Sequence, residues 1–328
     1  MPPPSFTFAH MKDYKDLRIV FMGTPEFAVA SLDTLVKAGC NIVGVITAPD
    51  KHAGRGMQLQ QSAVKKYAVE NNLHVLQPEK LKNPEFLTEL KSLNADLQIV
   101  VAFRMLPEVV WNMPPMGSVN LHGSLLPQYR GAAPINWAVM NGEKEAGVTT
   151  FKLKHEIDTG DILLQESFPI GENENAGEVH DRMKEIGAAL LVRTMKELAD
   201  GTLNEMPQTQ SDRDGQTALK HAPKIFTATC EIDFNKTAIE VHNLIRGLSP
   251  FPGAFTFLNG KMLKIYKSEK EASGEGERAT KKPGEYISDG KTLLKFACAD
   301  GFVAVKELQL EGKKRMNVED FLRGYRFE

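Results

Sequence analysis

Along the first two thirds of the chain, short apolar runs alternate with longer segments in which apolar residues recur at helical spacing. The apolar runs resemble strands buried on both faces of a sheet and predict strands at 17–22, 41–47, 74–78, 96–103 and 117–122. Helices are predicted between them at 25–39, 62–72 and 83–93. This alternation predicts an α/β fold with a doubly wound, mostly parallel, Rossmann-like sheet.

The pattern changes further along the chain. Residues 147–153 and 161–170 alternate like an antiparallel strand pair, and 176–201 has the spacing of a long amphipathic helix. Residues 204–222 lose apolar periodicity and predict a linker. After a helix at 237–248, short strands predict a small OB-like β-barrel, at 254–259, 261–268, 284–289, 292–299 and 302–311.

We therefore expect two domains, which fits a chain of 328 residues, about twice the usual domain length. The α/β domain is predicted at 11–203, the linker at 204–223 and the barrel domain at 224–328. Residues 1–10 lack the apolar core of a secretory signal and are interpreted as a vector remnant or an upstream extension.

Composition and charge narrow the possible classes of protein. Forty basic and 42 acidic residues give a formal net charge of −2, so any nucleic-acid surface must come from local clustering. Three cysteines without a CxxC pair argue against a zinc site or a disulfide framework and favour a reducing cytoplasm. No apolar run reaches the roughly 18 residues of a membrane span. We expect a cytoplasmic protein without membrane association.

The candidate chemistry lies at the end of the last predicted parallel strand. Asn120 and His122 are two residues apart, so both side chains point to the same face of that strand. Side chains at the carboxyl ends of parallel strands face the ligand crevice of such a sheet. An amide can stabilise an oxyanion and an imidazole can move a proton. Asp158, in the DTGD turn at 158–161, is the best candidate for a third partner.

Each of these residues also has an ordinary structural interpretation. A lone histidine is most often a hydrogen-bonded structural residue, and DTGD is a typical β-turn. The basic, glycine-rich segment 49–60 can be a solvated connection, or a loop that orders on a polyanion through Lys51 and Arg55. No metal-ligand spacing involves these residues, so we expect a metal-free site.

Taken together, the motifs resemble one family. NLHGSLLPQYRGAAPINWA (120–138) followed by DTGD is similar to the methionyl-tRNA formyltransferase family. The resemblance extends over most of the chain, through LRIVFMGTPEFA (17–28), TAPDKHAGRG (47–56), RGLSPFPGAF (246–255) and GKKRM (312–316). The NxH…D set alone marks the wider family that takes a formyl group from 10-formyltetrahydrofolate.

The resemblance implies a reaction and roles for the residues. The amine of methionine on initiator tRNA attacks the formyl carbon of 10-formyltetrahydrofolate. Asn120 holds the oxyanion, His122 transfers a proton, and Asp158 fixes the tautomer of His122 and relays charge. A turn grips the folate with its apolar walls, through Ser124, Leu125, Leu126 and Pro127.

The resemblance also implies a tRNA-binding surface, on an enzyme that we expect to be a monomer. Lys51 and Arg55 would contact the acceptor region, and the barrel would present a basic face made by Lys261, Lys264, Lys267, Lys313, Lys314 and Arg315. The alternating lysines at 261–267 also fit an ordinary solvated face.

Two alternatives remain open. One is a folate-dependent formyltransferase that acts on a sugar nucleotide or another small amine, and the other is a non-catalytic folate- or RNA-binding module. The sequence also departs from the family in two places. Arg104 stands where many relatives have glycine, in a segment (101–107) that is one residue short, and His52 stands where proline is common.

Overall fold

The computed structural model describes residues 13–53, 58–208, 218–272 and 281–327. Residues 1–10, for which the sequence suggested a remnant or an extension, lie outside these ranges. The chain forms two compact units. Unit 1 comprises Met1–Arg130, Gly147–Ser167 and Asp181–Leu219, and unit 2 comprises Gly131–Ala146, Phe168–His180 and Lys220–Glu328. The chain passes between the units more than once, and the linear boundaries at 203 and 224 stay a prediction.

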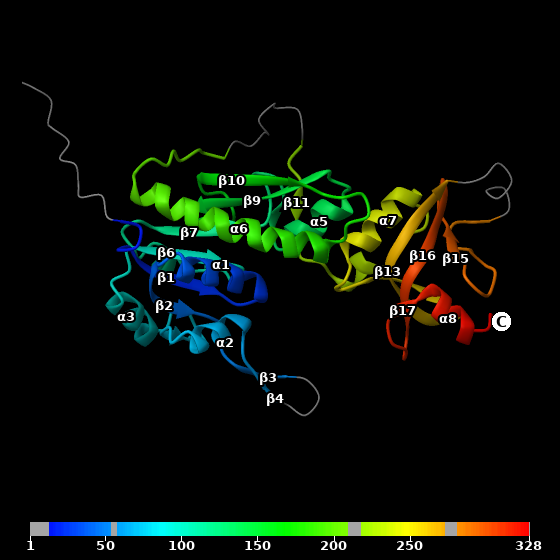
Figure 1. Cartoon of the computed structure of the whole chain (residues 1–328), viewed down its shortest axis with the longest axis horizontal. Helices are drawn as coiled ribbons and strands as arrows, with labels where there is room; N and C mark the ends of the chain where they lie inside the picture. The colour runs from blue at the N-terminus through cyan, green and yellow to red at the C-terminus, as the bar shows by residue number, and fades with distance from the viewer. Residues whose placement is uncertain (1–12, 54–57, 209–217, 273–280, 328) are drawn as a thin grey trace, which may run out of the picture. The chain divides into compact units, whose positions relative to one another are not determined.

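A seven-stranded sheet forms the core of unit 1, in the order β10-β9-β7-β6-β1-β2-β5 (Figure 1). Five strands are parallel: β1 (Arg18–Gly23), β2 (Asn41–Ile46), β5 (Val75–Leu76), β6 (Leu97–Val101) and β7 (Ser118–His122). β9 (Glu145–Lys152) pairs antiparallel with β7, and β10 (Ile162–Pro169) lies at the edge. Because β1 and β6 are buried along almost their whole length, their apolar runs gave no alternation in the sequence. The predicted Rossmann-like sheet is confirmed.

Helices connect and cover these strands: α1 (Glu26–Lys37), α2 (Ala63–Glu70), α3 (Pro84–Ser92), α4 (Glu108–Trp111) and α6 (Ala176–Ala199). Side-chain caps explain two of the starts, since Ser62 accepts from Lys65 N and Asn83 accepts from Glu85 N. α6 packs on β7 and β9, where Gly187 approaches Leu121 closely (Figure 1). None of the described helices combines the length and apolar character needed to cross a membrane.

The strand order of unit 1 identifies the edge of the sheet where a ligand crevice is expected. From β1 the chain builds the sheet outward through β2 and β5, and then returns to place β6 and β7 on the other side of β1. This change of direction is the topological switch point, and ligands bind there beyond the carboxyl ends of the strands. The ends of β6 and β7 lie next to each other, with Val101 opposite Leu121.

An antiparallel sheet in the order β12-β13-β16-β15-β14 forms the core of unit 2, and β17 pairs with β16. Its strands are β12 (Ala254–Leu258), β13 (Lys261–Ala272), β14 (Tyr286–Ser288), β15 (Leu294–Ala297), β16 (Gly301–Leu310) and β17 (Met316–Asn317). The sheet is a half-barrel. The sequence located its five main strands, and β13 continues four residues beyond the predicted end.

Shorter elements complete unit 2. They are α5 (Pro134–Met140), β11 (His221–Ala222), a 3₁₀ turn (Thr227–Cys230), α7 (Ala238–Gly247) and α8 (Val318–Gly324). The short strand β8 (Arg130–Gly131) joins the last residue of a unit 1 segment to the first residue of a unit 2 segment. α7 begins at Thr237 with a capping box that includes Glu240. Its apolar face packs into the core of the half-barrel through Val241 and Ile245.

Arg246 is a buried cation that joins α7 to another segment of unit 2. The residue is 5% exposed, and its guanidinium donates to the carbonyl oxygens of Glu174 at 2.9 Å and Gly171 at 3.4 Å, and to Asn243 Oδ1 at 2.8 Å. Arg246→Met fills similar space but removes these donors from acceptors that are partly buried. We expect the free energy of unfolding to fall by about 2–4 kcal/mol.

Urea unfolding followed by circular dichroism measures this loss. The matched control is Arg323→Met on α8, because the Arg323 side chain is 76% exposed and its ion pair with Asp320 adds little stability. Equal stabilities of the two variants would contradict a structural role for Arg246.

Candidate active site

β7 carries Asn120 and His122 to the carboxyl edge of the sheet. Between β6 and β9, Asn120 is opposite Val100 and His122 is opposite Thr149. Asn120 is half-buried, and within the described residues its carboxamide makes no hydrogen bond. His122 is 7% exposed, and its ring meets Phe151 edge-on with 6.5 Å between centroids. On one face, the strand therefore presents the Asn120 amide, which makes no hydrogen bond to the described residues, and the buried imidazole of His122.

The surroundings of His122 determine its tautomer. Its Nε2 lies 2.9 Å from the carbonyl oxygen of Tyr129. A carbonyl oxygen only accepts, so Nε2 carries the hydrogen and donates it. In the neutral ring, Nδ1 then has a free lone pair. The sequence interpretation gave this orienting role to Asp158, but the geometry gives it to the Tyr129 carbonyl.

Asp158 faces the other nitrogen of the same ring. Its Oδ2 is 3.9 Å from His122 Nδ1, which is within ion-pair range but too long for a hydrogen bond. The Asp158 side chain is 12% exposed, so a positive charge on the ring would be poorly hydrated and would interact strongly with the carboxylate. The structure thus brings together two residues that are far apart in sequence, and leaves Nδ1 free to accept a proton.

The turn after β7 is held by one hydrogen bond within the turn and one to β9. Ser124 Oγ donates to the carbonyl of Gln128 at 2.6 Å, and Leu126 N donates to Thr149 Oγ1 at 3.1 Å. Leu126 is 3% exposed and packs with Phe151 in a small core cluster. The side chain of Leu126 therefore anchors the turn, and its predicted contact with folate stays a prediction. Among the four residues predicted to bind folate, Leu125 and Pro127 are half-buried.

The segment after β6 lies beside the same edge. Arg104 donates to the carbonyl of Glu79 at 2.9 Å and also to the carbonyl of Pro78, so its charge ties two loops together. Met105 is 74% exposed, which is unusual for a large apolar side chain. The departure from the family pattern at Arg104 thus has a local structural function, and Met105 leaves an apolar surface next to it.

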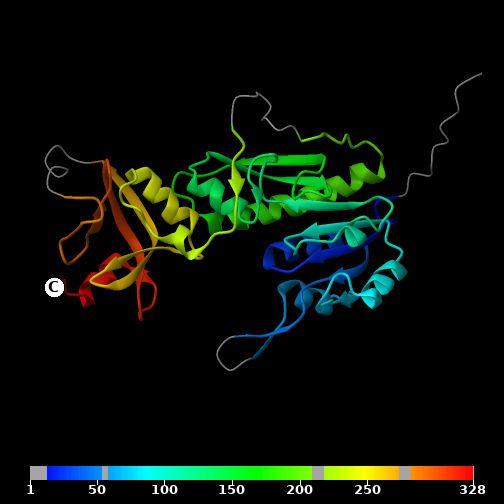
Figure 2. The same cartoon turned by 180° about the vertical axis from the view of Figure 1, so that it is seen from behind.

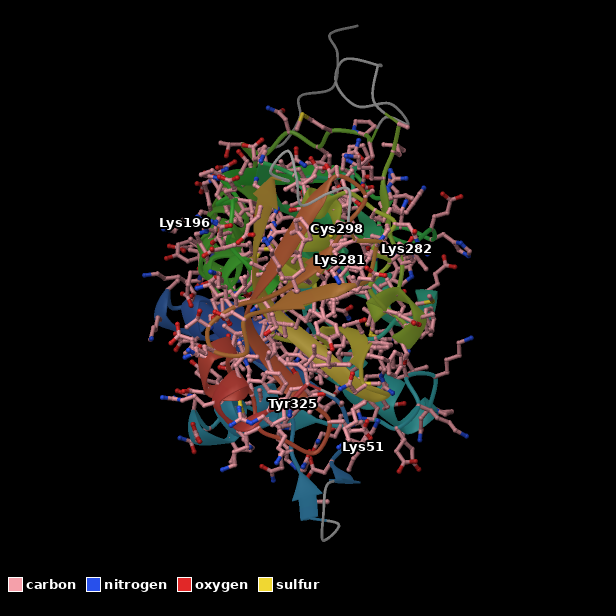
Figure 3. All side chains as sticks on the ribbon, turned by 90° about the vertical axis from the view of Figure 1, so that its right-hand side faces the viewer. Lys51, Lys196, Lys281, Lys282, Cys298 and Tyr325 are labelled. Carbon is pink, nitrogen blue, oxygen red and sulfur yellow. The ribbon has the colours of Figure 1, made fainter. Side chains whose placement is uncertain are left out.

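A hairpin extends from the end of β2, formed by β3 (Lys51–Ala53) and β4 (Gln58–Gln60) (Figures 1 and 2). At its base, the Asp50 carboxylate accepts from Gln77 Nε2 at 2.8 Å and from Lys65 Nζ at 2.5 Å. The hydrogen bond from Gln77 has the largest effect on the Asp50 carboxyl. Together with the hydrogen bond from Lys65, it holds the pKa of Asp50 below its ordinary value. Lys51, labelled in Figure 3, is exposed on this anchored hairpin. Arg55, predicted with it, lies outside the described residues.

The basic residues predicted on the half-barrel fall into two groups. Lys264 donates to the carbonyl of Pro252 at 2.9 Å, and Arg315 makes two hydrogen bonds to Glu307 and lies 4.2 Å over the ring of Tyr266. The Glu307 carboxylate thus compensates the charge of Arg315, and a backbone carbonyl accepts a hydrogen bond from Lys264. Four lysines are exposed: Lys261, Lys267, Lys313 and Lys314.

Lys261, Lys313 and Lys314 share one end of unit 2. Met262 N and O pair with Glu311 across the start of β13 and the end of β16, and this pairing brings the turn at 311–315 beside Lys261. We call these three residues the lysine cluster. In the part of the chain that the structure describes, no set of three or more His, Cys, Asp and Glu residues is arranged to hold a metal ion.

Sequence reasoning missed two residues of the candidate site. Tyr129 lies inside the quoted motif, but the pattern does not indicate that its backbone carbonyl is the functional group. Gln208 lies in the segment interpreted as a linker, and no periodicity marks it. Its side chain hydrogen-bonds to both Arg130 and the loop that carries Asp158.

Comparisons with known proteins identify the family of this chain. Residues 17–195 match the family described as formyl transferase, and residues 224–326 match the formyl transferase C-terminal domain. The methionyl-tRNA formyltransferase of Bacteroides fragilis is 52% identical over 316 residues, covering 95% of this chain and 96% of the relative. That of Phocaeicola vulgatus is 55% identical over 318 residues, covering 95% and 97%.

Solved structures with lower identity share the fold. The sugar 3N-formyltransferase WlaRD, solved with dTDP and 5-N-formyl-THF, has a TM-score of 0.65 at 22% identity and covers 93% of this chain and all of its own. HypX from Aquifex aeolicus, in complex with tetrahydrofolic acid, has a TM-score of 0.61 at 19% identity. It covers 95% of this chain and 48% of its own.

Proposed function

Because the chain belongs to the methionyl-tRNA formyltransferases, a family of formyl-transferring enzymes, we propose that its unit 1 site formylates the methionine of initiator methionyl-tRNA and so supports translation initiation. The formyl donor is 10-formyltetrahydrofolate. The observation that carries the assignment to this site is the pair formed by His122 and Asp158 beside Asn120, at the edge where the fold binds ligands.

His122 prepares the attack of the amine. Its Nε2 hydrogen is occupied by the Tyr129 carbonyl, so Nδ1 is the atom that takes a proton from the attacking amine. The carboxylate of Asp158, 3.9 Å from Nδ1, stabilises the imidazolium that results. The same proton then passes to N10 of the folate as the bond between N10 and the formyl carbon breaks. The new bond joins the formyl carbon to the methionine nitrogen, so the protons balance.

Asn120 stabilises the charge on the formyl oxygen during the attack. Its carboxamide is half-buried and has no hydrogen-bond partner among the described residues, so its N–H groups are free to donate. A donor placed at such an oxyanion contributes about 2.7–4 kcal/mol to the transition state. Asn120 and His122 lie on one strand face and can therefore act on the same carbonyl.

The folate fits the edge beyond β6 and β7. Met105 supplies an exposed apolar surface for a flat ring, and the hydrogen-bonded turn at 124–127 gives the edge a fixed shape. We assign Leu125 and Pro127 to folate contact through their half-buried side chains. Ser124 and Leu126 hold the turn in place.

The exposed lysines are assigned to tRNA phosphates. Lys51 lies on a hairpin whose base is fixed by Asp50, and the lysine cluster gathers three cations on a protein of net charge −2. Local clustering of this kind attracts a polyanion even when the whole chain is not basic. The enzyme is proposed to act in the cytoplasm as a monomer.

The experiment that tests the function compares acceptors of the formyl group. Purified enzyme with 10-formyltetrahydrofolate is incubated with initiator methionyl-tRNA, elongator methionyl-tRNA or a dTDP-linked amino sugar, and the products are identified by mass spectrometry. We expect rapid formylation of the initiator alone. Preferential formylation of the amino sugar would establish the alternative function, and formylation of neither class would point to a non-catalytic binding protein.

A further inference from the structure

Gln208 forms hydrogen bonds through both ends of its side-chain amide. Its Oε1 accepts from Arg130 Nε at 3.0 Å and from Arg130 Nη2 at 2.6 Å. Its Nε2 donates to the carbonyl of Asp158 at 2.9 Å and to that of Gly160 at 2.7 Å. Only a side chain with both a strong acceptor and two N–H donors makes this set of contacts. Gln208 therefore connects the end of the turn after β7 to the loop that carries Asp158.

The two ends of this connection adjoin the two partners of the His122 ring. Arg130 follows Tyr129, whose carbonyl binds Nε2, and Asp158 faces Nδ1. Tyr129 and Asp158 both have left-handed backbone conformations, with φ of 58° and 54°. Such conformations cost about 1–3 kcal/mol each and persist where surrounding contacts hold them. Gln208 supplies contacts of this kind on both sides of the ring.

Gln208 is itself held in place by the sheet. Met206, two residues earlier, pairs with Ile162 by two backbone hydrogen bonds of 2.8 and 2.9 Å. On the loop, Gly160 is so close to β9 that an added Cβ would lie 1.5 Å from the carbonyl oxygen of Lys152. The Asp158 loop is therefore fixed at Gly160 by close packing and at Asp158 by the carboxamide.

We propose that Gln208 is a positioning residue that sets the separation between His122 and Asp158. This inference rests on the roles proposed for those two residues. Without the two donated hydrogen bonds, the loop relaxes from its left-handed conformation and the carboxylate moves away from Nδ1. Displacements of about 1 Å at a reacting group lower rates by up to about 100-fold. The loss falls on the chemical step and not on tRNA binding.

Two substitutions of Gln208 separate the roles of its two ends. Gln208→Met keeps the length of the side chain and removes all four hydrogen bonds. Gln208→Glu keeps the acceptor for Arg130, and strengthens it with a charge, but cannot donate to the two carbonyls. We expect both variants to lower kcat by roughly 10–50-fold with KM for methionyl-tRNA changed less than about twofold. Full activity of Gln208→Glu would show that the residue serves only Arg130 and would overturn the proposal.

The control is a variant of the same segment that leaves these bonds intact. Glu205 forms an ion pair with Lys152 three residues before Gln208, and Glu205→Gln removes that charge. We expect its kcat to stay at the wild-type value. A fall equal to that of Gln208→Met would mean that any loosening of the segment slows the enzyme, and the specific role of Gln208 would be wrong.

A double-mutant cycle connects Gln208 to Asp158. In an Asp158→Ala enzyme, measured in single turnover, we expect Gln208→Met to have no further effect on the rate. Additive losses would overturn the proposal. If Asp158→Ala alone is fully active, the proposed role of Asp158 fails. If Asp158→Ala is slow and Gln208→Met is fast, only the positioning role of Gln208 fails.

Discussion

Replacing His122 with glutamine is expected to lower kcat for formyl transfer by about 10²–10⁴-fold, the range typical of a lost general base. Glutamine can still donate a hydrogen bond toward the Tyr129 carbonyl, which His122 Nε2 approaches to 2.9 Å in the wild-type enzyme. Its amide does not take up a proton near neutral pH. The variant therefore tests proton transfer while preserving much of the buried contact.

His122→Ala should be equally slow and also less stable. It leaves a cavity beside Phe151 and removes the donor to a buried carbonyl, a loss of about 1–3 kcal/mol in the free energy of unfolding. Rapid-quench formylation assays and urea unfolding measure the two effects separately. If His122→Gln retains more than about a tenth of the wild-type kcat, the proton-transfer role assigned to Nδ1 is wrong.

The sheet could be predicted from the sequence because strands that are buried on both faces consist mostly of apolar residues. β1 and β6 are apolar along nearly all of their length, and the cap at which the neighbouring helix α2 begins, Ser62, is visible in the sequence. The two-residue period of a strand placed Asn120 and His122 on one face before any geometry was known. Backbone periodicity thus predicted which strand carries the site and which of its side chains act together.

Other parts of the site are not indicated by any pattern in the sequence. The Tyr129 carbonyl is recognised as the acceptor for His122 Nε2 only when the two atoms are seen 2.9 Å apart, because any residue type has a carbonyl. Leu126 is apolar in the same way whether or not it packs on Phe151, so the sequence does not reveal the contact that the structure shows. Gln208 lies in a polar segment whose composition resembles that of a linker. Its role depends on contacts to residues 48 and 78 positions away, which no local pattern encodes.

On the half-barrel, the charge of a residue alone does not predict whether the residue is available to bind tRNA phosphates. Lys264 and Arg315 have the charge that tRNA binding requires, but their donors already face Pro252 and Glu307. Releasing these donors for a phosphate would break bonds that are present in the free protein, so we expect their net contribution to binding to be small. The lysine cluster is exposed and has no such competing partners among the described residues.

Two sets of substitutions are therefore expected to weaken tRNA binding by different amounts. Replacing Lys261, Lys313 and Lys314 together with alanine should flatten the log–log salt dependence of the binding constant by about 2–2.7, since each phosphate contact contributes roughly 0.7–0.9. At physiological salt this corresponds to about 100-fold weaker binding. The pair Lys51→Ala and Arg55→Ala should flatten the slope by about 1.4–1.8.

The binding constant for methionyl-tRNA across a salt series measures both slopes, and folate affinity is measured beside it. Arg315→Ala is the matched control. It removes one cation from the same face, but that cation is compensated by Glu307, so the slope should stay within about 0.3 of the wild-type value. An unchanged slope in the triple variant would remove the phosphate-binding role from the lysine cluster. Equal losses of tRNA and folate affinity in the hairpin pair would instead place Lys51 at the folate site.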